Sequence, residues 1–358
     1  MGNRILGGAA ARRRLHDLRR GEVRDMILGG SITSALTSFA GLGLALILER
    51  DGAECVRLGW TDANEPRMVV SAEEYDDEAI AAAVHRHAIV GAAPNSWMQA
   101  DLAAARWNGR NAVFSPRVKT AITEKQWHAL QLDRHRGIDR ETEDRGHEID
   151  VELIGALGEP AYWRHVGKSP RPDEGANRWE MKTRNRGEDF VRNRLRQLAK
   201  IVAARDASLI RSGLTGEKLV DEAYKNKRSD DSRTATGLTA PRFTDSALAW
   251  CALWGISSFP VIHRLAGPSV TAGAVPIGRF APEKLILPVL VGAYSLERWR
   301  ALILSEELSQ AEADAGVAVR GWLASHGVRA VVSFRLHISD NKSAPEHSLG
   351  AGRVKVLA

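Results

Sequence analysis

The sequence predicts an α+β protein in which helices and short antiparallel strands are mixed along the chain. Three observations support this class. An apolar helix pattern near the start is followed by two short strand patterns and a second helix, without the regular strand–helix alternation of a parallel sheet. The middle of the chain has helix patterns rich in basic residues. A helix-rich last part contains a long alternating strand, and 44% of the 358 residues are hydrophobic, which is enough to form a core.

The first predicted helix covers Ile32–Leu48, with Ser31 as its N-cap and Gly52 beyond its end. Residues 55–60 and 68–71 have strand patterns and are separated by turn-forming residues. Residues 76–89 begin with acidic side chains and continue with Ala, Val and Ile, which favours a second helix.

The patterns in the second half predict further elements. In 187–205, the apolar side chains recur at spacings of four, three and four, as expected for one face of a helix: Val191, Leu195, Leu198 and Val202. Thr244 is expected to begin an apolar helix that ends at Ile256 and places Trp250 and Trp254 in the core. The pattern then predicts a strand, two helices and an alternating strand, at 285–292, 295–308, 311–326 and 328–338.

Charge divides the chain into four predicted parts. They are a basic N-terminal arm, an N-terminal α+β domain, a basic helical and loop segment, and a helix-rich C-terminal domain, at 1–30, 31–175, 176–242 and 243–358. The net charge of +6 separates into +4 for 1–30, −7 for 31–177, +7 for 178–242 and +2 for 243–358. A concentrated positive charge favours binding to a polyanion, although a solvated basic surface has the same composition.

The candidate nucleic-acid contacts come from the basic segment. Arg192, Arg196 and Lys200 are four residues apart, so a helix would align them in a stripe that can follow a phosphate backbone. Basic loops are expected before and after this helix, and they contain Lys182, Arg184, Asn185, Arg186, Lys225, Lys227, Arg228 and Arg233.

The common catalytic patterns are absent from the sequence. It has no phosphate-binding GxxxxGK[ST] loop and no GxSxG, and its two cysteines are too few for a cysteine zinc site. We therefore expect no catalytic residues, no metal site and no cofactor. The alternative is a metal-dependent nuclease in which Asp173, Glu180 and Lys182 form a PD…ExK pattern.

The long apolar run at 32–48 is diluted by Thr, Ser and Gly, which favours a buried helix over a membrane span. The arginines upstream are not followed by a cleavage site of small residues. The sequence thus predicts a cytoplasmic protein that does not contact the membrane.

Three blocks resemble the large subunit of type I CRISPR surveillance (Cascade) complexes, in the compact form of subtype I-G, formerly I-U. The blocks cover about half of the chain and are Leu36–Leu44 leading to Val56–Trp60, Arg186–Val191 through Asp231–Leu238, and Ala247–Ile256 followed by Phe259–Val261. They consist of a helix followed by a strand, a basic region and an apolar LALWG helix, and none is a catalytic motif.

This resemblance implies a non-enzymatic subunit that works with guide RNA, target DNA and the backbone subunits of the complex. Such a subunit recognises the motif beside the target, stabilises the opened DNA and recruits a helicase-nuclease. The residues that could read this motif (PAM) are Asn95, Gln99, Asn108, Arg110, Asn111, Lys119 and Lys125. Trp97 and Trp107 are either wedges between bases or core residues. A protein-interaction scaffold is the remaining alternative.

Overall fold

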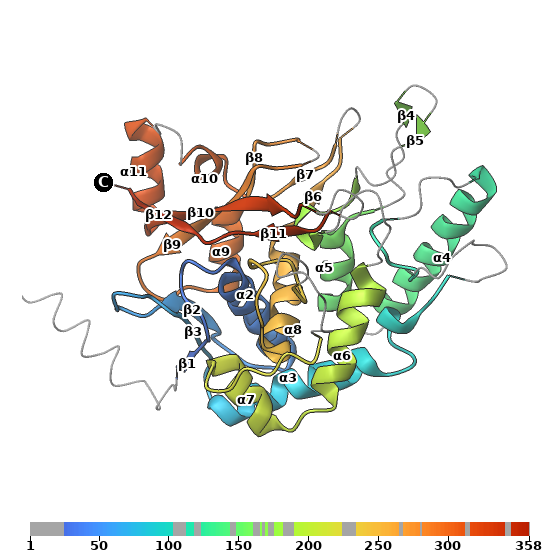
Figure 1. Cartoon of the computed structure of the whole chain (residues 1–358), viewed down its shortest axis with the longest axis horizontal. Coiled ribbons are helices and arrows are strands. Elements are labelled where there is room, and N and C mark those ends of the chain that lie inside the picture. Colours follow the sequence, from blue (N-terminus) through green and yellow to red (C-terminus); the bar gives the residue numbers. More distant parts are fainter. Residues whose placement is uncertain are drawn as a thin grey trace, which may run out of the picture.

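The computed structural model describes residues 25–102, 112–117, 123–143, 148–159, 165–166, 169–170, 175–181, 190–223, 234–264, 268–279, 281–311, 316–340 and 345–357. Helices and short antiparallel strands in several small sheets confirm the predicted α+β class (Figure 1).

The first sheet has three antiparallel strands in the order β1-β3-β2, with β1 at Met26–Ile27, β2 at Arg57–Trp60 and β3 at Met68–Ser71. The two strands predicted from the sequence therefore pair with each other. Helix α3 (Asp77–Ala92) also begins where predicted, because the Asp76 carboxylate accepts a hydrogen bond from the Ala79 amide at 2.9 Å.

Helix α2 (Ala35–Arg50) is the central helix of the fold. Every residue from Ala35 to Leu48 is buried, which confirms the predicted core helix. The helix begins later than expected, with Ser34 rather than Ser31 at its N-cap. It packs closely on α8 (Ser246–Trp254), since a Cβ built on Gly43 would lie 1.9 Å from the Cys251 carbonyl oxygen.

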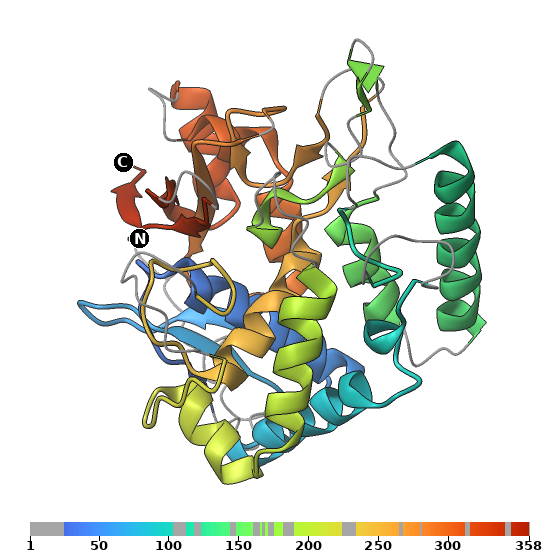
Figure 2. The same cartoon turned by 45° about the vertical axis from the view of Figure 1, so that its right-hand side comes forward.

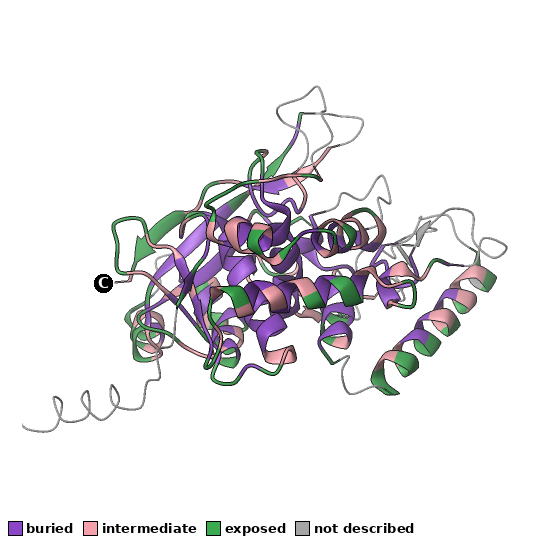
Figure 3. Cartoon of the chain, turned by 90° about the horizontal axis from the view of Figure 1, so that it is seen from below, coloured by how far each residue is buried: buried purple, intermediate pink, exposed green. Residues whose placement is uncertain are grey.

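The middle of the chain is mainly helical. Its elements are η1 (Trp97–Gln99), α4 (Glu124–Glu143), α5 (Glu148–Leu157), the strand pair β4 (His165–Val166) and β5 (Ser169–Pro170), η4 (Arg178–Glu180), the π-helical η5 (Val191–Leu195), α6 (Arg196–Ala203) and α7 (Ala207–Thr215). The helix predicted over 187–205 is thus observed from Val191 to Ala203, with a π-helical first part. Figure 3 shows α4 at its right-hand edge, with mostly exposed and half-buried residues.

The last part contains the largest sheet. Helix α8 begins after Asp245, not Thr244, and continues into η6 (Gly255–Ser258). Strands β6 (Val261–Ile262) and β7 (Val270–Thr271) form a pair. The five-stranded sheet has the order β11-β10-β9-β8, with β12 also paired to β10, and its strands are β8 (Ala274–Val275), β9 (Lys284–Leu290), β10 (Val328–Ile338), β11 (His347–Leu349) and β12 (Arg353–Val356).

In the described part of the connection from β9 to β10 there are three helices, α9 (Leu296–Ile303), α10 (Glu306–Gln310) and α11 (Val317–Ser325). The prediction of one helix over 295–308 was wrong. Ser305 interrupts it by capping α10, where its hydroxyl accepts a hydrogen bond from the Leu308 amide at 3.2 Å. The strand predicted over 328–338 has the observed bounds of β10.

Buried apolar residues between Met26 and Leu349 form one core. Helix α2 belongs to the predicted N-terminal domain and α8 to the predicted C-terminal domain, yet they pack against each other. Helix α6 from the basic segment contacts both α3 and α8, and Figure 2 shows it in front of α8. All four predicted parts therefore contribute to one core, since Met26 and Leu28 of the predicted N-terminal arm are also buried in it. Within the described ranges, none of the helices has the length and apolarity needed to cross a membrane.

Candidate nucleic-acid interface

The three residues of the predicted basic stripe, Arg192, Arg196 and Lys200, differ in their exposure and contacts. Lys200 is exposed and Arg192 is half-buried, while the opposite face of the helix buries Leu198 and Val202 in the core. The π-helical turn contains Arg192 and shifts it around the helix axis relative to Arg196. Lys200 and Arg192 therefore stay candidates for phosphate contacts.

Arg196, the middle member of the stripe, is already used inside the protein. Its Nε donates to the Met98 carbonyl oxygen at 2.8 Å, and its Nη2 lies 2.7 Å from Asp101 Oδ1. Its side chain is 13% exposed, so it fixes α6 to the segment after η1. A phosphate would have to compete with these partners for the guanidinium group.

Arg194 joins two segments that are distant in the sequence. Its Nη1 donates to the Glu180 carbonyl oxygen at 2.9 Å and to the Thr236 carbonyl oxygen. Met181 and Gly237 also lie next to each other, since a Cβ built on Gly237 would be 2.5 Å from Met181 Cβ. We call this meeting point the Arg194 junction. Residues 180–181 come directly before the basic segment 182–189, and residues 236–237 follow shortly after the basic segment 224–233. The junction therefore holds one end of each basic segment close to the other.

A buried ion pair lies beside the junction. Arg117 donates to the Glu180 carboxylate, and the two side chains are 6% and 1% exposed. His347 lies close by, because its carbonyl oxygen is 3.0 Å from a Cβ built on Gly237. Burial, together with the charges of Arg117 and Arg194, lowers the pKa of His347 to about 4. The imidazole is therefore neutral at pH 7.

Four segments outside the described residues adjoin this junction in sequence: 118–122, 182–189, 224–233 and 341–344. Together they contain nine Lys or Arg and four Asp or Glu. Most of the predicted nucleic-acid and motif-reading residues lie outside the described ranges, and they are Lys182, Arg184, Asn185, Arg186, Lys225, Lys227, Arg228, Arg233, Asn108, Arg110, Asn111 and Lys119. For these residues the assignment stays a prediction.

The described motif-reading candidates have different environments. Asn95 is exposed just after α3, and Lys125 is exposed on α4. Gln99 is used internally, because its Nε2 donates to the Gly91 carbonyl oxygen at 3.0 Å and so closes the end of α3. Trp97 is 3% exposed and donates to Asp150 Oδ1 at 2.8 Å, so it is a core residue and not a wedge.

The nuclease alternative depends on Glu180, which the ion pair with Arg117 has already neutralised in a buried position. That environment does not suit a magnesium ligand, which needs an accessible carboxylate. Asp173 and Lys182 lie outside the described ranges. Among the residues that the structure describes, no group of three or more His, Cys, Asp or Glu is placed to hold a metal ion.

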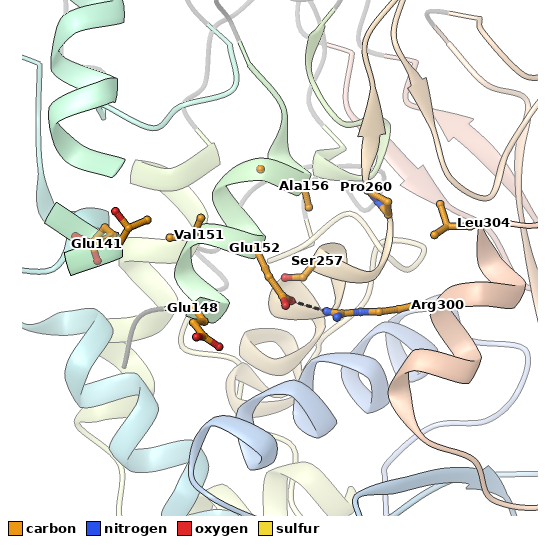
Figure 4. A pocket seen from close by; sticks show the side chains of 11 residues that line it. Glu141, Glu148, Val151, Glu152, Ala156, Ser257, Pro260, Arg300 and Leu304 are labelled. Carbon is orange, nitrogen blue, oxygen red and sulfur yellow. Dashed lines mark hydrogen bonds and ion pairs between the residues drawn. The ribbon is translucent and has the colours of Figure 1, made fainter. Parts of the chain in front are cut away.

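Two cavities lie on either side of α5. The first, of about 660 Å³, is lined by His87, Trp97, Phe114 and Asn95 among others. The second, of about 630 Å³, is shown in Figure 4, where Glu152 reaches from α5 to Arg300 of α9 and the two side chains are 2.7 Å apart. Glu141 and Glu148 also line this second cavity, so its charge disfavours phosphate.

Arg117 and Arg194 were not among the residues predicted from the sequence. Arg194 lies within the predicted helix but off the predicted stripe, and its partners are carbonyl groups 14 and 42 residues away. Contacts of this kind, between a side chain and distant backbone carbonyl groups, cannot be predicted from a sequence pattern. His87 was also missed, since a lone histidine in an apolar helix usually belongs to the core.

No model of a known protein family matches the chain, and a search of curated proteins found no similar sequence.

Proposed function

We propose that this protein is a non-enzymatic, cytoplasmic subunit of a CRISPR-type surveillance complex that uses a guide RNA to find foreign DNA. In this role it binds next to the backbone subunits, recognises the motif beside the target, stabilises the opened DNA and recruits a helicase-nuclease. Guide pairing would read the sequence, while the protein holds phosphates and reads the adjacent motif.

The observation that carries the proposal is the Arg194 junction. Arg194 joins the described ends that lead into the two basic segments 182–189 and 224–233. Arg192 and Lys200 lie on the same helical stretch as Arg194, from Val191 to Ala203. Cations gathered in this way suit a nucleic-acid backbone, for which phosphate contacts supply much of the affinity.

The first experiment measures binding of duplex DNA by the full chain at several salt concentrations. We expect Arg192→Ala/Lys200→Ala to weaken binding and to make the logarithmic salt dependence shallower by about two, since each lost phosphate contact removes about 0.9 from the slope. Arg196 is kept, because its loss would also break the contacts to Met98 and Asp101.

The matched control removes the same charge elsewhere. Arg57 and Arg329 are exposed on β2 and β10, so Arg57→Ala/Arg329→Ala should keep the wild-type slope. If both double variants changed binding equally, the effect would be one of net charge and the interface would be wrongly placed. If the wild type did not bind DNA even at low salt, the scaffold alternative would replace our proposal.

The second experiment tests the guided assembly. The purified chain would be added to the backbone subunits and guide RNA of its own system, and opening of a matched duplex would be followed by permanganate reactivity of the displaced strand. We expect opening to require this chain and the correct flanking motif. Equal opening without the chain would contradict the proposed role. Cleavage of DNA by the chain and magnesium alone would favour the nuclease.

A further inference from the structure

The cavity lined by His87 has the features of a ligand site that the proposed function does not yet use. It has a volume of about 660 Å³ and lies between the end of α3, the η1 segment and helices α4 and α5. This volume is within the range of small-molecule sites. We call it the His87 cavity.

His87 supplies a polar group without a partner. Its side chain is 7% exposed, and its Nδ1 has no hydrogen-bond partner among the described residues. The ring packs against Trp250 and Trp254, with centroid distances of 5.4 and 4.4 Å. Burial lowers its pKa to about 3, so at pH 7 the neutral ring offers one N–H donor and one acceptor. A buried polar atom left in this state is destabilising unless a ligand or water satisfies it.

The walls are aromatic and held in place. Trp97 meets Phe114 edge to face at 5.7 Å. The Trp97 indole donates to Asp150 at 2.8 Å, and Asp150 also accepts from Arg50 at 2.8 Å. Asn95 stands at the exposed edge of the cavity and offers an amide that can both donate and accept.

The charges lining the cavity balance. Arg50 and Arg140 are matched by Asp150 and Glu141. An ion such as a free phosphate gains little from such a lining, because attraction and repulsion offset each other. A neutral, planar, polar group gains both the aromatic walls and the hydrogen-bonding groups of His87 and Asn95.

We propose that the His87 cavity binds a nucleobase turned out of a nucleic-acid strand. This inference rests on the proposed function, because the strand must first be held by its phosphates. His87 and Asn95 would bond to the edge of the base, and Trp97 and Phe114 would contact its ring. Turning a base out of a stack costs a few kcal/mol, and the cost is least for a strand that is already single.

The experiment compares two single strands of equal length and charge, one with normal bases and one composed of abasic sites. Affinities of the full chain are measured across a salt series. We expect the wild type to bind the base-containing strand at least about fivefold more tightly, which is the low end for one base against an aromatic wall. His87→Phe and Asn95→Ala should each reduce this preference at least about twofold. The salt slope should stay unchanged, because it reports phosphate contacts alone.

Asn64→Ala, in the exposed β2–β3 turn, is the matched control and should keep the full preference. Asn95 is itself exposed, so Asn95→Ala tests the inference even if His87→Phe disturbs folding. Equal affinity for both strands, with a normal salt slope, would overturn the inference and leave the proposed function standing. So would a preference that both cavity variants retain. Failure to bind either strand at low salt would contradict the proposed function together with the inference.

Discussion

At the scale of single residues, Glu49 connects the stability of the protein to pH. Burial is the main cause that raises its pKa to about 7, and the negative charges of Glu297 and Glu152 act in the same direction, against Arg300. The folded chain therefore holds this proton more tightly than the unfolded chain. As the pH rises from 4.5 to about 7, the unfolded state ionises first and the folded state loses stability.

We predict that Glu49→Gln raises the free energy of unfolding above pH 7.5 by about 1 kcal/mol, after allowance for solvent screening, and changes it little near pH 4.5. Thermal unfolding of both proteins across this pH range is the measurement. Glu65→Gln, in the exposed β2–β3 turn, controls for the loss of a charge. A constant difference at all pH values would contradict the explanation.

The Arg117–Glu180 pair gives a second prediction at this scale. Both side chains are buried, so Arg117→Met leaves a carboxylate without its cation and should lower the free energy of unfolding by about 3 to 5 kcal/mol. Arg117→Met/Glu180→Met removes both charges and should recover most of that loss. Urea unfolding of the wild type and the two variants measures these free energies of unfolding. If the double variant were as unstable as the single one, packing and not charge would explain the loss.

At the scale of secondary-structure elements, the α2–α8 contact depends on a missing side chain. A Cβ on Gly43 would lie 1.9 Å from the Cys251 carbonyl oxygen and 2.5 Å from the Gly255 nitrogen, both of which are backbone atoms. Such atoms cannot move aside without separating the two helices.

We therefore predict that Gly43→Ala lowers the melting temperature strongly or prevents folding. Gly155→Ala on α5 is the matched control, because a Cβ there has open space around it. It should stabilise the protein by about 0.5 to 1 kcal/mol through the helix preference of Ala. Similar melting temperatures for the two variants would contradict the close packing.

Elements with strong periodic patterns could be predicted from the sequence. The buried α2, the β2–β3 pair and β10 followed from continuous or alternating apolar residues. Short strands such as β6 and β12 could not be predicted, since only their pairing with other strands, and no apolar pattern of their own, defines them. The π-helical start of α6 could not be predicted either, because its residues fit an ordinary helix equally well.

At the scale of the whole molecule, the shared core predicts cooperative unfolding. Helix α2 packs on α8, and α3 packs on α6, so distant parts of the chain stabilise one another. We expect a single thermal transition, with circular dichroism and tryptophan fluorescence giving the same midpoint. Two separate midpoints would show that the parts distinguished by charge also unfold independently.

The candidate interface was predictable only in part. Charge counting predicts it in the basic segment, where Lys200 is exposed, and this placement stays a prediction. Counting charges could not show that Arg196 is bonded to Met98 and Asp101 inside the protein, unlike a surface residue free to contact phosphate. The Arg194 junction could not be predicted either, because every residue has a backbone carbonyl group and the sequence does not indicate which of them will accept a hydrogen bond.

The Arg194 junction has a consequence for binding kinetics. Two basic segments attached at one place present themselves to a polyanion as two linked ligands. In the proposed function, binding of one segment would raise the effective concentration of the other at the same strand, so the two together would release it more slowly than either alone. Arg194→Ala would loosen the two attachment points while leaving every charge in the basic segments in place. A surveillance subunit built in this way would keep hold of DNA while its motif is being read.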